Sequence, residues 1–428
     1  MVVGKRSQGK LSRAQALLLA LFCLTMLDSV LTYFMGTLLG RVFPVNAVLP
    51  PLIAIAGLLF GFRRVLPPGK AWVWILIGVC GFVIGILTVE EFPFSYWMQI
   101  STAIAAFCIG YAVVNLDVSA RAFAYSTGAI GAIYVGVCLM ALLGIYPRLF
   151  PIIEKIHFEL GQVITRPEVT ADPNYQVFYL FPVILPLVLE FRYRAFVFSL
   201  FGALCALYLE SRLQSRSGSL IIAGATAVAW WAAFRNSKGI GRVALFVSTA
   251  IAALVVLIKI KAILALGTDI VHRFTVSEMG TLYGRIYSAT YLFEKLIDPL
   301  FWLPQGYEDF KAITGKHNVP HFNPTGFFLQ GGILGLAAWI GIFLLPYLRL
   351  AKGFVVNRLD GLAGVVFVAS TTVMIASFSL NVVFTEAVWL WGGAVWGALS
   401  RQRRSARAPQ AAVHGGTYPD RLGSQRAT

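Results

Sequence analysis

Long apolar runs alternate with short polar connections over most of this chain. A helix that crosses a bilayer needs about 20 mostly apolar residues, and twelve stretches approach that length. They lie near residues 15–38, 46–62, 71–88, 97–115, 122–146, 174–191, 195–209, 218–234, 243–264, 325–348, 361–382 and 384–399. Because a backbone in lipid must satisfy its own hydrogen bonds, the pattern predicts an all-α polytopic membrane protein with about 12 transmembrane helices.

The composition agrees with this fold class. Hydrophobic residues make up 58% of the 428 residues and charged residues only 13%, whereas soluble domains have about 25% charged residues. So little charge cannot cover a water-facing surface, which excludes a soluble enzyme and a disordered chain. The net charge of +16 would suggest nucleic acid in a soluble protein, but here cations are expected on cytoplasmic loops. No nucleic-acid partner is predicted.

The distribution of Lys and Arg predicts the orientation. With the N-terminus in the cytoplasm, 22 of the 35 Lys and Arg residues fall on inside segments, and every inside connection carries at least one. An even number of spans then returns the basic C-terminus to the cytoplasm. The first apolar run lacks a small-residue cleavage site, so we expect a first membrane helix and not a removed signal peptide.

Four segments follow from this topology. They are 1–264 with helices one to nine, an outer loop over 265–324, 325–400 with helices ten to twelve, and a disordered basic tail over 401–428. Long loops are often functional. Within this loop, 282–303 has apolar residues at helical spacing, which predicts an interfacial amphipathic helix with Leu292 and Leu296 toward lipid. Arg285 then lies on its polar face, where a charge needs no further role.

Two arginines break the positive-inside trend on the outer turn Glu210–Ser219. Arg212 and Arg216 are four residues apart, so on a helical turn they would share a face. Guanidinium groups bind phosphate bidentately and stay charged, and the pair therefore suits a diphosphate clamp. The alternative is that both side chains snorkel to lipid headgroups. Gly218 would let a backbone or a substrate approach closely.

Two histidines precede the tenth predicted helix. His317 and His321 can each accept a hydroxyl proton near neutral pH, or simply be hydrogen-bonded loop residues. Pro320 interrupts a helix that would align them for metal binding, and no third ligand is nearby, so neither a metal nor another cofactor is predicted. Asp28 would pair with an arginine or shape a cavity, and Glu386 would orient a base or pair with an arginine.

Four motifs resemble, in their order, the O-antigen ligase and O-antigen polymerase superfamily of bacterial membrane glycosyltransferases. They are Asp172-Pro173-Asn174, Ser215-Arg216-Ser217-Gly218, Arg285 with a later stretch containing Gly306, and a histidine before Gly332-Ile333-Leu334-Gly335. The family histidine stands about eleven residues before the first of these last glycines, which favours His321. The family's His-Asn pair instead matches His317-Asn318, so both histidines stay open.

The resemblance implies a twelve-helix bundle of the bacterial inner membrane, with a periplasmic lid of short helices and a periplasmic active site. It implies en bloc transfer of a glycan from undecaprenyl pyrophosphate to an acceptor hydroxyl, without metal or ATP. Arg216 and Arg285 would hold the pyrophosphate, Arg212 would add a second contact, and Asn174 and Glu386 would support the site. A ligase would use lipid A–core as acceptor, whereas a repeat-unit polymerase would extend another lipid-linked glycan.

A secondary transporter or a lipid-linked oligosaccharide flippase is the alternative from another class, since twelve spans suit it equally. Transporters usually show paired repeats and interrupted helices that meet near the bilayer midplane. The two halves of this chain show no clear similarity, and its polar residues cluster at the outer surface. Both features favour periplasmic chemistry over transport.

Overall fold

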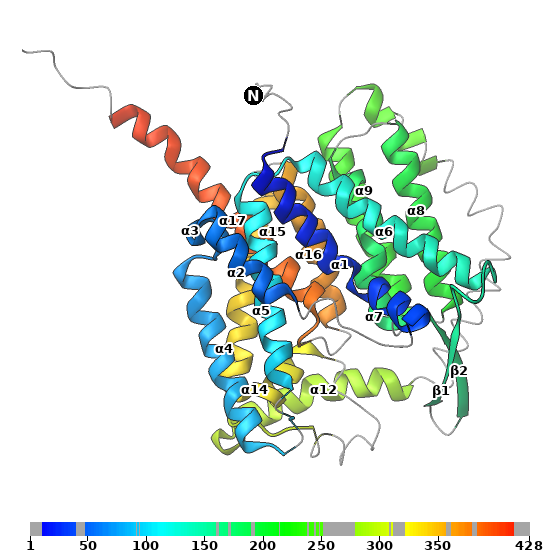
Figure 1. The fold of residues 1–428 in the computed structure, drawn as a ribbon, viewed down its shortest axis with the longest axis vertical. Helices are drawn as coiled ribbons and strands as arrows, with labels where there is room; N and C mark the ends of the chain where they lie inside the picture. The colour runs from blue at the N-terminus through cyan, green and yellow to red at the C-terminus, as the bar shows by residue number, and fades with distance from the viewer. Residues whose placement is uncertain are drawn as a thin grey trace, which may run out of the picture.

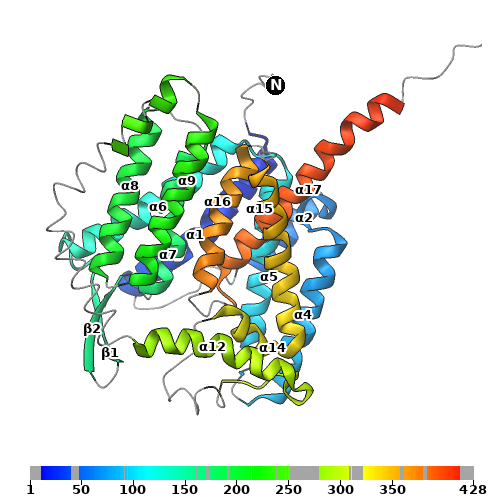
Figure 2. The same ribbon diagram turned by 180° about the vertical axis from the view of Figure 1, so that it is seen from behind.

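The computed structural model shows a helical bundle with a β-hairpin at one end (Figures 1 and 2). It describes residues 11–39, 48–90, 92–93, 95–159, 162–169, 173–189, 193–213, 215–237, 239–243, 245–247, 249–250, 279–307, 310, 322–356, 361–378 and 383–414. The first half comprises α1 (Arg13–Leu39), α2 (Leu49–Phe60), α3 (Phe62–Val65), α4 (Gly69–Thr88), α5 (Tyr96–Asn115) and α6 (Ala120–Leu142).

The remaining elements follow in chain order. The hairpin strands are β1 (Ile153–Glu159) and β2 (Gln162–Glu168), followed by α7 (Pro173–Leu180), the 3₁₀ helix η2 (Phe181–Val188), α8 (Tyr193–Arg212) and α9 (Arg216–Asn236). Then come α12 (Met279–Ile297), the 3₁₀ turn η4 (Pro299–Phe301), α14 (Asn323–Trp339), the π-helical turn η5 (Ile340–Leu344), α15 (Leu345–Val355), α16 (Gly361–Ser377) and α17 (Glu386–His414). Pro182 and Pro186 lack N–H donors, which explains why η2 is not a regular α-helix.

Six described helical segments are long and apolar enough to cross a membrane: Arg13–Gly36, Gly69–Thr88, Tyr96–Asn115, Ala120–Leu142, Gly218–Arg235 and Asn323–Val355. Shorter apolar helices cover Leu49–Phe60, Tyr175–Val188, Phe198–Glu210 and Gly361–Ser377. An all-α, multi-pass membrane protein is therefore supported in its main features. Twelve spans stay a prediction, because most of 243–264 lies outside the described residues.

The β-hairpin was not predicted. The segment 147–173 was expected to be an outer loop, but Ile153–Glu159 and Gln162–Glu168 pair as antiparallel strands. Phe158 faces Val163 and Ile156 faces Thr165 in the register, and such aromatic and β-branched pairs favour strand pairing. The two strands are short enough to be missed among the long apolar runs.

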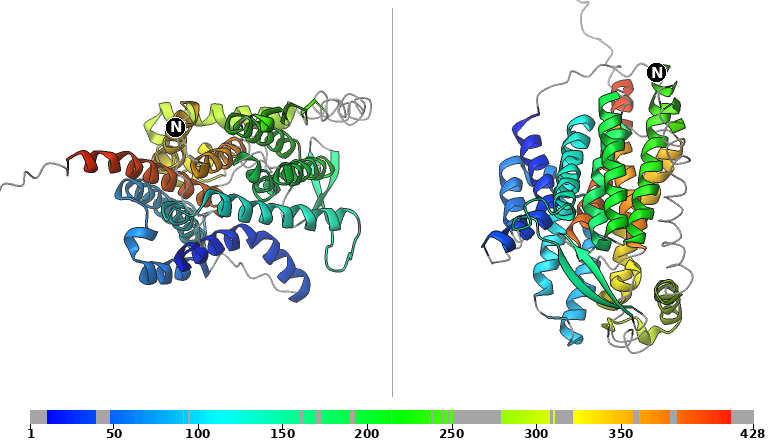
Figure 3. Two further views of the ribbon diagram at one scale, coloured as in Figure 1. Left: turned by 90° about the horizontal axis from the view of Figure 1, so that it is seen from above. Right: turned by 90° about the vertical axis from the view of Figure 1, so that its right-hand side faces the viewer.

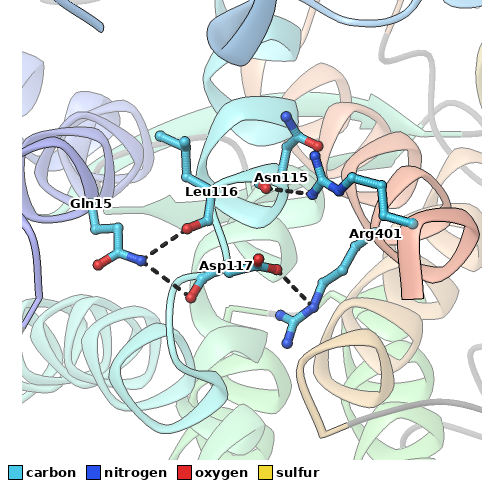
Figure 4. Close-up of polar contacts among 6 residues, drawn as sticks. Gln15, Asn115, Leu116, Asp117 and Arg401 are labelled. Atoms are coloured by element: carbon cyan, nitrogen blue, oxygen red, sulfur yellow. Dashed lines mark hydrogen bonds and ion pairs between the residues drawn. The ribbon is translucent and has the colours of Figure 1, made fainter. Parts of the chain in front are cut away.

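The start of α1 and the end of α17 lie at the same end of the bundle (Figures 1 and 3). Asp117 in the α5–α6 turn joins them: its Oδ1 lies 3.0 Å from Arg401 Nε, and its carbonyl accepts a hydrogen bond from Gln15 (Figure 4). Arg235 at the end of α9 donates to the Phe354 carbonyl of α15 over 3.0 Å at this same end. We call it the termini end, and the other end, which carries α12 and the hairpin, the α12 end.

Trp391 of α17 marks the centre of the core. Its ring is fully buried, and the rings of Phe22, Phe123 and Phe181 lie 5.2, 5.8 and 5.8 Å from it. The three phenylalanines come from α1, α6 and η2, so α17 holds early and middle parts of the chain together. The pairs of Trp391 with Phe22 and Phe123 are edge-to-face, and such pairs stabilise the core in addition to the burial of apolar surface.

The first residues of α14 form a re-entrant helix. Gly332 has φ 59° and ψ −153°, which breaks the helix there. A β-carbon added at Gly335 would overlap the carbonyl oxygen of Phe327, although an unbroken helix would place these residues more than two turns apart. Phe322 and Trp339 also share Phe378, with ring distances of 5.6 and 6.0 Å. The chain therefore descends from Asn323, reverses at Gly332 and ascends again.

The helix predicted within residues 282–303 is present as α12. It runs across the direction of the long bundle helices, near the bottom of Figure 2. Its predicted lipid-facing side is only partly exposed. Phe293 is 65% exposed, but Leu292 is buried against Phe328 and Leu336 of α14. Sequence periodicity identifies an apolar face without saying whether protein or lipid covers it, which explains the difference.

The C-terminal segment also differs from its prediction. A disordered tail was expected from residue 401, yet α17 continues as a helix to His414 and projects from the bundle (Figure 1). Arg401 and Arg404 tie the start of this extension to the segment around the α5–α6 turn, with Arg404 donating to the Asn115 carbonyl over 2.7 Å. Because of these contacts, the helix continues beyond its apolar segment.

Candidate functional site

The turn between α8 and α9 carries two of the predicted phosphate-binding arginines. α8 ends at Arg212 and α9 begins at Arg216. The expectation that they share one helical face is wrong, because the chain turns between them. Arg212 is exposed, and the side chain of Arg216 lies outside the described part. Since the other end of α9 meets α15 at the termini end, this turn faces the α12 end.

A buried carboxylate underlies this turn. Glu210 has no exposed surface, and a β-carbon added at Gly218 would overlap its carboxylate. Gly218 was expected to allow a close approach by a backbone or a substrate. In the structure, the group that approaches Gly218 is the side chain of Glu210. The sequence signal for this contact was an acidic residue at the end of an apolar helix.

The same turn is held by local hydrogen bonds. Ser215 caps α9, since its Oγ accepts the Gly218 N–H over 3.1 Å. Its own N–H donates to the Glu210 carbonyl over 2.9 Å, and the Ser219 hydroxyl donates to the Ser215 carbonyl over 2.9 Å. Capping by a serine satisfies one of the free N–H groups of the first turn. The backbone that carries both arginines is thus fixed by several bonds.

The helix α7 lies next to this turn, in the middle of the bundle, and contacts α6, α9, α16 and α17. Asn174 is its second residue, with a side chain outside the described part. Buried Gln176 donates to the Val169 carbonyl, which ties α7 to the end of the hairpin. Tyr179 stacks on Tyr134 of α6 with ring centroids 4.9 Å apart. α7 therefore begins at Pro173, the second residue of the Asp-Pro-Asn motif.

Two acidic residues singled out in the sequence converge on this helix. Asp28 of α1 and Glu386, the first residue of α17, both interact electrostatically with Tyr179. Both carboxylates are half-buried. The hydroxyl of Tyr134 accepts the Val30 N–H over 3.1 Å. The tyrosines were missed, because a tyrosine in an apolar helix usually marks the membrane interface.

The helix that carries Arg285 is docked onto the start of α14. The Thr325 hydroxyl donates to the Ser288 carbonyl over 2.6 Å. Ser288 lies three residues after Arg285, and Thr325 lies four residues after His321. The Arg285 side chain and both predicted histidines, His317 and His321, lie outside the described residues. Their neighbours in the chain are nevertheless brought together.

A loop after α12 fills the break in α14. The N–H groups of Gln305 and Gly306 donate to the Leu329 carbonyl over 3.1 and 3.0 Å, and the Ile333 N–H donates to the Trp302 carbonyl over 2.8 Å. Gly332 lies inside the predicted tenth span, where it reverses the helix. The bonds satisfy backbone groups that the reversal would leave unpaired, which a membrane interior requires.

Tyr287 is a residue of α12 whose pKa is shifted. Burial and the nearby Glu294 carboxylate raise the pKa of Tyr287, so its phenol stays neutral over a wider range than in water. Within the described part of the chain, no three His, Cys, Asp or Glu residues lie close enough together to hold a metal ion. The described part of the candidate site therefore contains the helix ends that carry arginines, the buried Glu210, the half-buried Asp28 and Glu386, and tyrosines.

Comparison with known proteins adds no assignment. The sequence matches no protein-family model, and no curated protein matches it significantly. The resemblance to the O-antigen ligase and polymerase superfamily therefore rests on the four motifs and their spacing.

Proposed function

We propose that the protein is a membrane glycosyltransferase that moves a glycan en bloc from undecaprenyl pyrophosphate to an acceptor hydroxyl at the α12 end, the predicted periplasmic face. The observation that carries the proposal is the Thr325–Ser288 hydrogen bond. It joins the helix of Arg285 to the segment that follows His321, at the end toward which the Arg212–Arg216 turn also faces. Segments that neighbour Arg285 and His321, and the turn that carries Arg212 and Arg216, thus come from distant parts of the chain and support this proposal.

The chemistry suits these residue types. The bond between the anomeric carbon and the pyrophosphate oxygen breaks, and the leaving diphosphate gains negative charge. Fixed guanidinium groups of Arg216 and Arg285, with Arg212 beside them, would stabilise that charge. His321 or His317 would accept the proton of the acceptor hydroxyl as it attacks, a role worth about 10²–10⁴-fold in rate. Asn174 and Glu386 would support the site from α7 and α17.

A transfer assay tests the proposal. Purified protein is mixed with undecaprenyl-pyrophosphate glycan and either lipid A–core or a second lipid-linked repeat unit, with EDTA and without ATP. Glycan on lipid A–core identifies a ligase, and a ladder of longer lipid-linked chains identifies a polymerase. We expect Arg216→Ala, Arg285→Ala and one of His317→Ala and His321→Ala to abolish transfer. Arg403→Ala, at the termini end, is the matched control.

A transporter or flippase of lipid-linked oligosaccharide is the second candidate, and the re-entrant helix favours it. Discontinuous helices that meet inside a bundle are common in secondary transporters, and α14 reverses at Gly332, which is itself buried. Reconstitution separates the two. Movement of a fluorescent lipid-linked oligosaccharide across vesicle bilayers, with no transfer to either acceptor, would replace the glycosyltransferase by the transporter.

A further inference from the structure

The contact between Glu210 and Gly218 links the two helix ends that carry the arginines of the turn. Glu210 lies two residues before Arg212, and Gly218 lies two residues after Arg216. The Glu210 carboxylate occupies the space where a side chain at Gly218 would begin. The separation of the two arginine-bearing backbones therefore depends on a contact that no residue larger than glycine at position 218 would allow.

The position of this carboxylate is demanding. Glu210 has no exposed surface and acts electrostatically on Cys138 of α6, so it faces the interior of the bundle. A buried ionisable group in a membrane protein is costly and usually marks a functional constraint. The first turn of α9 offsets part of this cost, because the positive end of a helix dipole stabilises a nearby negative charge.

Two groups of the protein lie at Gly218, on the first turn of α9. Ser215 Oγ already accepts the Gly218 N–H, and the Glu210 carboxylate covers the α-carbon of Gly218. The N-terminal turn of α9 is thus occupied by groups of the protein. On the α8 side of this turn, the Arg212 side chain is exposed and can meet an anion.

We propose that Glu210 is a positioning residue for pyrophosphate binding: its carboxylate, seated on Gly218, sets the geometry between the end of α8 and the start of α9. This inference rests on the proposed function, because it assigns Glu210 a role through Arg216 and Arg212. Glu210 does not itself touch the substrate. Its loss would misplace the arginines while leaving their charges intact.

Binding of undecaprenyl pyrophosphate to the full-length protein in detergent micelles provides the test. Glu210→Gln keeps the shape and removes the charge, and Gly218→Ala displaces the carboxylate while keeping every charge. Glu210→Asp keeps the charge with a shorter reach. Gly224→Ala is the matched control on α9, since nothing lies within 4 Å of a β-carbon there, and Glu154→Gln removes an exposed acid of the hairpin.

We expect Glu210→Gln and Gly218→Ala to raise the Kd at least tenfold, Glu210→Asp to recover part of the loss, and both controls to bind like wild type. In an Arg216→Ala background, Glu210→Gln should add little, because residues that act through one another are not additive. A merely structural role would instead lower the melting temperature and add in full to Arg216→Ala.

The outcomes separate this inference from the proposed function. Tight binding by wild type, weakened by Arg216→Ala but unchanged by Glu210→Gln, would overturn the role of Glu210 alone. No measurable binding by wild type would overturn the role of Glu210 and the proposed function together. If Gly218→Ala does not fold, the Glu210→Gln and Glu210→Asp pair still decides the question.

Discussion

The carbonyl oxygen of Phe327 lies against the α-carbon of Gly335, eight residues further along the chain. An unbroken helix would keep these atoms about 12 Å apart, so the contact demonstrates the reversal of α14. The reversal buries the start of the helix that follows His321 and sets it against α12. The packing of the two halves of α14 against each other therefore positions one half of the candidate site.

Replacement of Gly335 by alanine should destabilise the protein. The added methyl group would overlap the Phe327 carbonyl, and overpacking of this kind typically costs about 1–3 kcal/mol. The measurement is the thermal unfolding midpoint in detergent, with Gly136→Ala as control, since nothing lies within 4 Å of a β-carbon there. Equal midpoints for the two variants would contradict the reversal.

Replacement of Gly332 by alanine should cost more than a positive φ alone explains. Its φ is 59° and an added β-carbon would overlap the Trp302 carbonyl. Gly144 has φ 65° with nothing within 4 Å, so Gly144→Ala reports the backbone strain of about 1–3 kcal/mol by itself. The difference in unfolding midpoint between the variants measures the contact with the loop. A Gly332→Ala protein as stable as Gly144→Ala would argue against that contact.

Loss of the Thr325 hydroxyl should loosen α12 without unfolding the bundle. Thr325→Val keeps the volume and removes the hydrogen bond to the Ser288 carbonyl, worth about 1 kcal/mol. Hydrogen exchange should become faster over Met279–Ile297 and stay unchanged over Tyr96–Asn115. Thr290→Val serves as the control, because its hydroxyl donates to the Tyr287 carbonyl within α12. Uniformly faster exchange in every helix would point to global destabilisation instead.

The ion pair between Asp117 and Arg401 should contribute little stability. The two side chains are 54% and 22% exposed, and such pairs are worth at most about 1 kcal/mol and are screened by salt. We expect Asp117→Asn to lower the unfolding midpoint by no more than a few degrees, and less in high salt. Asparagine is also suited to the positive φ of this position, so a large loss would show that Asp117 does more than pair with Arg401.

Cysteine labelling should place α12 and the end of α17 on opposite sides of the membrane. Glu294→Cys and Arg403→Cys introduce exposed thiols on α12 and α17, in a Cys80→Ser background because Cys80 is an exposed native thiol. A membrane-impermeant maleimide should label Glu294→Cys in intact spheroplasts and Arg403→Cys only after lysis. Labelling of both before lysis would contradict the proposed topology.

Hydrophobic length was sufficient to predict most helices, because a lipid solvent forces each apolar run to satisfy its own backbone hydrogen bonds. For this reason α1, α4, α5 and α6 correspond to predicted spans. The structure has the start of α1 and Arg401 of α17 at one end of the bundle, whereas the cytoplasmic location of both termini stays a prediction. Amphipathic spacing located α12. Apolar length and amphipathic spacing are properties of one continuous segment, so the sequence of that segment is enough to predict a helix.

Contacts between distant segments were beyond such reasoning. The reversal at Gly332 depends on a loop that donates hydrogen bonds to Leu329, and nothing in the Gly-Gly pair specifies that partner. Asp28 and Glu386 both act electrostatically on Tyr179 although they lie on helices far apart in the chain. Glu210 and Gly218 lie on consecutive helices, but their contact depends on how the turn between those helices folds. Apolar periodicity states which face of a helix avoids water, but the choice between lipid and another helix is made by packing, since lipid tails are as apolar as a helix surface.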